Sequence, residues 1–206
     1  MSEAGFILVL DIAVRIEILL YAVCMAAFFY PFMAGKKEQR KSRIKKVLMV
    51  FLIYTVMYFV NMATSVYGWL CMIIVIILLA AASKFLDMNR EFTFFLGVIF
   101  FSIKNLSALI MRSISYFLGK NLEHRAETAE NVFANAAWNY VFVAVLQLIL
   151  FSVMLYAVIR LLKKKTMKLH IKELCYLLLI PITGILFVNI IFNILLIVNE
   201  NTIIQL

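Results

Sequence analysis

Residues 47–83 read VLMVFLIYTVMYFVNMATSVYGWLCMIIVIILLAAAS, a run of 37 residues without a charged side chain. A helix needs about 20 apolar residues to cross the roughly 30 Å hydrocarbon core of a bilayer. The run is therefore too long for one crossing, but it fits two crossings joined by a tight turn. Tyr67, Gly68 and Trp69 lie near its middle, where glycine permits a sharp turn and the aromatic rings suit the membrane interface. The run predicts a helical hairpin within a membrane.

The composition of the whole chain agrees with this interpretation. Hydrophobic residues make up 66% of the 206 residues and the mean hydropathy is +1.02, whereas soluble proteins have about 45–50% apolar residues. The net charge is +9, but the basic residues lie in short blocks between apolar runs rather than along one solvated face. We therefore expect the lipid bilayer, and no nucleic acid, as a partner.

Apolar runs of membrane-spanning length recur along the chain. The run at 92–118 is interrupted only by Lys104 and Arg112, and its length favours a crossing over a surface helix. We expect an all-α, polytopic membrane protein with a single transmembrane domain over residues 1–206. Its six helices are expected at about 6–34, 45–66, 69–84, 92–118, 132–160 and 174–198.

The distribution of lysine and arginine predicts the orientation. Residues 36–46 hold seven of them, 84–91 hold two and 160–173 hold six, and all three blocks lie on one side of a six-helix arrangement. The positive-inside rule places that side in the cytoplasm. We expect a multi-pass protein of the cell membrane with an extracytoplasmic N-terminus.

Residues suited to catalysis or metal binding are sparse. The sequence contains no nucleotide-binding, zinc-protease or nucleophile-elbow motif. Cys24, Cys71 and Cys175 lie in apolar segments without a CxxC pair, so we interpret them as packing residues and expect no metal and no cofactor. His170 and Cys175 are five residues apart, which separates them by about 140° around a helix. His124 lies among acidic residues, where a solvated surface histidine is expected.

Charged residues inside the apolar runs are the best candidates for function, because a charge at bilayer depth costs at least about 2.5–3.5 kcal/mol. At about 1.5 Å per residue from the outer helix ends, Glu17 and Lys104 lie at similar depths, and so do Asp11 and Arg112. The sequence therefore allows two ion pairs, Glu17 with Lys104 and Asp11 with Arg112. They could simply fix the register of the bundle. Alternatively, Arg112, Lys104 and Asn105 could line an outward-opening pocket for an anionic ligand.

Four stretches carry a resemblance to a known family: YPFMAGKK from Tyr30, VYGWLCM from Val66, SKFLDMNREFTFFLGVIFFSIKNLSALIM from Ser83, and KELCYLLLIPITGILF from Lys172. Together they resemble the membrane sensor region of GHKL-type sensor histidine kinases of Firmicutes, the group that contains the peptide-pheromone receptor of the accessory gene regulator system. The resemblance implies signal sensing in a two-component system, with an extracellular peptide ligand and a homodimer.

In that family a last transmembrane helix, a dimerising helix with the phosphoacceptor histidine and an ATP-binding domain follow the sensor helices. None of these is recognisable before Leu206, so we expect a sensor region cut before its seventh helix, without enzyme activity. Two other classes stay open. A peptidase that processes a signalling peptide would need a histidine shortly before a cysteine, which HIKELC matches loosely, and a small transporter subunit would favour an internal repeat.

Overall fold

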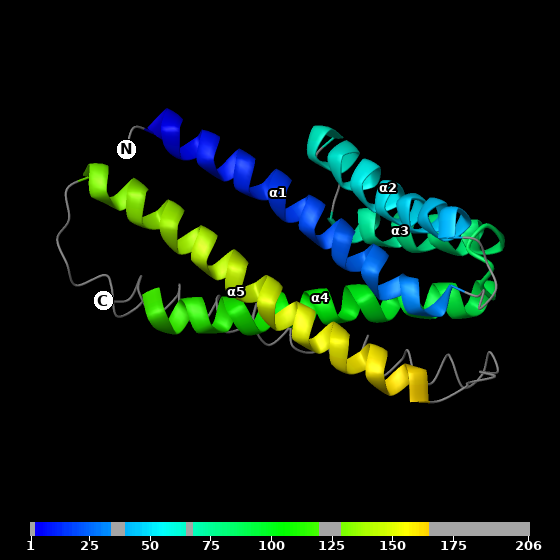
Figure 1. Cartoon of the computed structure of the whole chain (residues 1–206). Coiled ribbons are helices and arrows are strands. Elements are labelled where there is room, and N and C mark those ends of the chain that lie inside the picture. The colour runs from blue at the N-terminus through cyan, green and yellow to red at the C-terminus, as the bar shows by residue number, and fades with distance from the viewer. Residues whose placement is uncertain (1–2, 34–39, 65–67, 120–128, 165–206) are drawn as a thin grey trace. The chain divides into compact units, whose positions relative to one another are not determined.

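The computed structural model describes residues 3–33, 40–64, 68–119 and 129–164, all within a first compact unit, Met1–Thr166. Every described element is a helix, which confirms the all-α prediction. They are α1 (Glu3–Phe29), the 3-10 turn η1 (Tyr30–Phe32), α2 (Arg40–Thr64), α3 (Gly68–Ala81), the 3-10 turn η2 (Ala82–Lys84), α4 (Arg90–Gly119) and α5 (Ala129–Lys164) (Figure 1). The helix expected at 174–198 lies outside the described residues, and so does Tyr67 of the expected hairpin turn, whereas Gly68 and Trp69 already belong to α3.

The helices pack in chain order. α1 contacts α2, α2 contacts α3, α3 contacts α4 and α4 contacts α5, while α5 also returns to α1. Figure 1 shows α1 and α5 running in the same direction, with α2 and α4 running against them. Side chains of these four helices meet in a common interior, where Phe100 of α4 contacts Phe28 of α1, Tyr54 of α2 and Phe151 of α5.

The connections between helices follow local backbone chemistry. α1 passes into the 3-10 turn η1 around Pro31, because proline has no N–H to donate the hydrogen bond that would continue an α-helix. Between α3 and α4, Asp87 has φ 51°, a left-handed conformation that aspartate tolerates better than most residues. The carbonyl of Asn89 then accepts a 2.9 Å hydrogen bond from the amide of Thr93 and starts α4. Asparagine is among the residues that favour such a helix start.

Aromatic side chains fill the interior of this unit. Phe100 of α4 meets Phe151 of α5 with ring centroids 5.2 Å apart and Phe28 of α1 at 6.0 Å. Tyr21 of α1 also packs edge-on against Phe151, at 5.1 Å. Perpendicular and tilted rings place the positive edge of one ring against the negative face of the next. The core is therefore built by large residues that α1, α4 and α5 contribute together.

The outer surface of the unit is apolar as well. On α2 the large side chains that recur every four residues are exposed (Ile44, Leu48, Leu52, Val56 and Val60), and α5 exposes a similar series that includes Trp138, Phe142, Ile149 and Val153. Soluble proteins rarely expose continuous apolar surface on this scale. By length and composition, three described helices could cross a membrane: Ser42–Thr64, Arg90–Met111 and Trp138–Leu162. Residues 70–84 form a shorter apolar helix.

Candidate functional site

The main polar feature of the interior is the Lys104 side chain, near the middle of α4. Its Nζ donates a 2.8 Å hydrogen bond to the hydroxyl of Tyr54 and a longer one, 3.4 Å, to that of Tyr58. The same nitrogen lies over three tyrosine rings, 4.4 Å from the centroid of Tyr21, 4.5 Å from that of Tyr58 and 5.5 Å from that of Tyr54. We call Lys104 and these three tyrosines the lysine cage.

Helical spacing explains how the cage is assembled. Tyr54 and Tyr58 are four residues apart on α2, so they share one face and stack with ring centroids 4.4 Å apart. Tyr21 approaches from α1. Tyr54 and Tyr21 are almost fully buried, at 0% and 1% exposure, so the cage is part of the packed interior. Three separate helices must keep their rotation and height for Lys104 to keep its contacts.

Hydrogen bonds extend the cage toward α5. Gln147 donates to the hydroxyl of Tyr21 at 2.7 Å, and the hydroxyl of Tyr140 donates to the carboxylate of Glu17 at 3.3 Å. Gln147 and Tyr140 are seven residues apart, two helical turns, and so face the same side of α5. Glu17 and Tyr21 are four residues apart, about one turn, and so share one face of α1. The resulting polar network joins α1, α2, α4 and α5.

The energetics favour keeping this network intact. A lysine inside a membrane helix is costly, but a cation over an aromatic face is stabilised by about 2 kcal/mol or more when water is excluded. Hydrogen bonds to charged groups add about 1.5–3 kcal/mol each. The cage thus supplies Lys104 with several favourable contacts at once. Removing one contact leaves the cation less well solvated, because the packed side chains around it offer no replacement.

The structure does not join Glu17 and Lys104 directly. Among the described residues, the ion pairs of this unit include Arg15 with Asp11, at 2.9 Å and four residues apart on α1, but none between Glu17 and Lys104. Tyrosine rings surround the lysine instead, and Glu17 acts on it only as a nearby charge. Glu17 and Lys104 were expected to pair because they lie at similar depths. They lie near each other in the structure, but their hydrogen-bond partners are different residues.

The other residues predicted for a ligand pocket are placed only in part. The side chain of Arg112 lies outside the described part of the structure, so its expected pair with Asp11 stays a prediction. Asn105 points toward α3, where its amide nitrogen is 4.0 Å from the sulfur of Met72. The hydroxyl of Ser107 donates a 2.8 Å hydrogen bond back to the carbonyl of Lys104. In this arrangement Asn105 contributes to packing between α3 and α4.

A second charged contact lies at one end of the bundle. Lys46, near the start of α2, forms an ion pair with Asp87 in the turn before α4. The lysine side chain is 8% exposed and the aspartate 58%. Lys46 of the basic block 36–46 and Asp87 of the block 84–91 therefore meet at the same end of the described unit.

The histidine and cysteine residues considered as candidates for chemistry are described only in part, within residues 3–33, 40–64, 68–119 and 129–164. No group of three or more His, Cys, Asp or Glu residues there could hold a metal ion. Cys71 is buried, and its thiol donates to the carbonyl of Met57 at 3.6 Å. His124, His170 and Cys175 lie outside the described residues. The described arrangement is suited to holding helices in one register.

Sequence reasoning missed the tyrosines of the cage. The available signal was the pair Tyr54 and Tyr58, whose spacing places two hydroxyl groups on one face of an otherwise apolar helix. Tyr21 and Glu17 show the same spacing on α1. A search for polar groups at four-residue intervals in apolar runs would have found both pairs. Comparison with protein-family models, with curated proteins and with solved structures finds no match for this chain.

Proposed function

We propose that this chain is the membrane-embedded sensor region of a two-component signalling system and responds to an extracellular peptide. The proposal includes six membrane crossings, an extracytoplasmic N-terminus and no enzyme activity of its own. Its partners would be the bilayer, the peptide and a second copy of the chain. Support comes from the four sequence stretches that resemble GHKL-type sensors and from the apolar helices of the described unit.

The lysine cage is the observation that carries the proposal. A sensor needs an element with two discrete arrangements whose balance a ligand can shift. The Lys104 ammonium makes directional contacts with Tyr54 and Tyr58 on α2 and a ring contact with Tyr21 on α1. A rotation or a one-turn shift of α4 would break these contacts together. The cage therefore favours a small number of discrete positions of α4 over a continuous range of positions.

The ligand would reach the cage from the extracytoplasmic side. In the proposed topology, Arg112 lies two helical turns beyond Lys104 toward that side of α4. Arginine suits a peptide carboxylate because it can engage the group through two parallel hydrogen bonds. Arg112 and Lys104 lie on the same helix, α4. A ligand that shifts α4 by binding at Arg112 would therefore also change the contacts of Lys104 in the cage.

Alkylation of Cys71 offers a direct test. Cys71 is 2% exposed on α3, so its reaction rate should report how tightly the helices pack. Protein with Cys24→Ala and Cys175→Ala, reconstituted in lipid nanodiscs, would be treated with a maleimide in the presence of peptide fractions from the producing organism's culture medium. We expect one fraction to change the rate at least threefold, and Lys104→Met to abolish the change. Cleavage of a peptide by the unmodified chain, lost in Cys175→Ala, would instead support a peptidase.

A further inference from the structure

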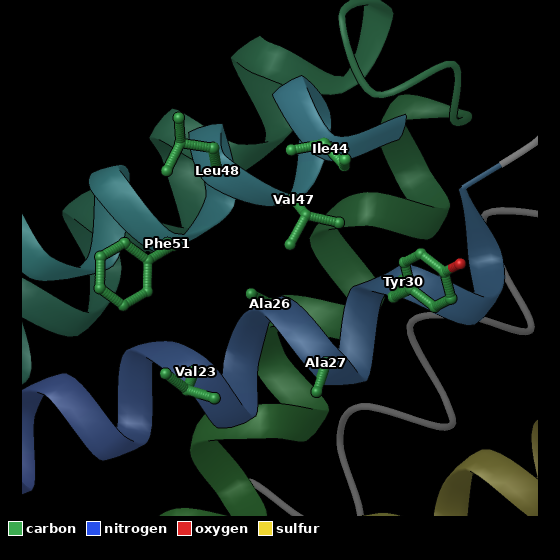
Figure 2. A pocket seen from close by; sticks show the side chains of 8 residues that line it. All are labelled: Val23, Ala26, Ala27, Tyr30, Ile44, Val47, Leu48 and Phe51. Atoms are coloured by element: carbon green, nitrogen blue, oxygen red, sulfur yellow. The ribbon is translucent and has the colours of Figure 1, made fainter. Parts of the chain in front are cut away.

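An apolar groove runs along the outside of α1 and α2 where the two helices approach their connection (Figure 2). Its volume is about 550 Å³, within the roughly 300–1,000 Å³ range of small-ligand sites. Val23 and Ala27 line it from α1, Tyr30 lines it from η1, and Ile44, Leu48 and Phe51 are among the residues that line it from α2. The only polar group among these side chains is the Tyr30 hydroxyl, at the end of the groove near Ile44.

One basic residue is in direct contact with that end. The guanidinium of Arg43 donates a 3.4 Å hydrogen bond to the Tyr30 hydroxyl and lies 5.4 Å from the centroid of the Tyr30 ring. These contacts hold a positive charge next to a groove-lining residue. Lys45, two residues later on α2 and about 200° around the helix from Arg43, is a second exposed positive charge at this level of the helix. The groove therefore has apolar walls along its length and positive charge at one end.

We propose that this groove binds one anionic phospholipid, with an acyl chain between α1 and α2 and the phosphate beside Arg43. From Tyr30 in η1 to Val23 in α1 the groove extends about 10 Å, most of the roughly 15 Å depth of one hydrocarbon leaflet. Tyr30 suits the boundary because its ring is apolar and its hydroxyl is polar. Basic pockets between membrane helices are a known way to recognise anionic headgroups.

Charge also distinguishes this occupant from a second copy of the chain. A two-fold contact across the groove would place the same surface of both copies together. Arg43 and Lys45 of one copy would then approach those of the other, and like charges in an interface are unfavourable. A lipid phosphate neutralises the same charges. The charge at the end of the groove thus favours an anionic lipid.

Native mass spectrometry of the full chain in detergent would test the proposal. Dioleoyl phosphatidylglycerol, dioleoyl phosphatidylcholine and chain-free glycerophosphoglycerol would be added separately. We expect one phosphatidylglycerol to remain bound at concentrations at which the other two do not. Equal retention of phosphatidylglycerol and phosphatidylcholine would overturn the charge-based part of the proposal, and with it the assignment to an anionic lipid.

Matched variants locate the site. Arg43→Gln with Lys45→Gln should weaken phosphatidylglycerol binding by about fivefold for each charge removed, whereas Arg160→Gln, an exposed charge on α5, should not. Ala27→Trp should fill the groove and abolish retention, whereas Ala157→Trp, at an exposed position of α5, should leave it intact.

Thermal unfolding without lipid would show whether each tryptophan variant is folded, and Val23→Trp provides a second groove-filling change. Retention that survives both groove-filling variants would refute the site. A dimer that forms without added lipid and is lost in Ala27→Trp would assign the groove to a second copy of the chain.

Discussion

Removing the Tyr54 hydroxyl provides the sharpest test of the lysine cage. Tyr54→Phe deletes the acceptor of the 2.8 Å hydrogen bond from Lys104 but keeps the ring, which stacks on Tyr58 at 4.4 Å and on Phe101 at 6.2 Å. The expected loss is therefore that of one hydrogen bond to a charged group, about 1.5–3 kcal/mol. For a chain of this size, a loss of about 2 kcal/mol lowers Tm by about 4–8 °C.

A double-mutant cycle separates this interaction from general damage. Lys104→Met retains an unbranched side chain but removes the ammonium, so Tyr54→Phe should cost less than about 0.5 kcal/mol in that background. Thermal unfolding in detergent micelles would give the four stabilities of the cycle. Tyr156→Phe is the matched control, because Tyr156 is 67% exposed on α5 and surface changes usually fall within about 0.5 kcal/mol.

The same measurement distinguishes the cage from a direct ion pair. Since no ion pair joins Glu17 to Lys104 within the described part of the chain, Glu17→Gln should couple to Lys104→Met more weakly than Tyr54→Phe does. Additive effects of Tyr54→Phe and Lys104→Met would refute the cage. Stronger coupling for Glu17→Gln would show that the two charges pair directly after all.

Three further predictions follow from other contacts. Asp87→Asn should lower the free energy of unfolding by about 1–2 kcal/mol, because Lys46 loses a charged partner. The loss should be smaller at high salt, since Asp87 is half exposed and salt screens the pair. Thermal unfolding at two salt concentrations measures both effects. Gly97→Leu should lower the free energy of unfolding by about 1–3 kcal/mol through overpacking, because even a Cβ at Gly97 would lie 3.3 Å from Ile76. Ile76→Ala should relieve part of this loss in the double variant. Additive losses of the two substitutions would contradict the contact. A cysteine replacing Lys41 should react with a membrane-impermeant maleimide only after cells are permeabilised, and labelling in intact cells would reverse the proposed orientation.

The sequence alone determined the helical class and the approximate positions of the described helices. This was possible because a backbone in lipid must satisfy its own hydrogen bonds, and an uncharged run of sufficient length can do so only as a helix. The run at 47–83 accordingly contains most of α2 and all of α3. The sequence also indicated Lys104 as a candidate, because a charged residue in an apolar run can be recognised without knowing its neighbours in space.

Only the tertiary structure decided which residues meet Lys104. In a helix that is apolar on nearly every face, such as α3 (GWLCMIIVIILLAA), the hydrophobic pattern does not fix how the helix is rotated or which helix it contacts. Matching charges by depth therefore suggested Glu17, whereas the packing of α1 and α2 placed Tyr21, Tyr54 and Tyr58 around the lysine. Helix depth follows from position along the chain, but lateral neighbours depend on side-chain packing between helices that are far apart in the sequence.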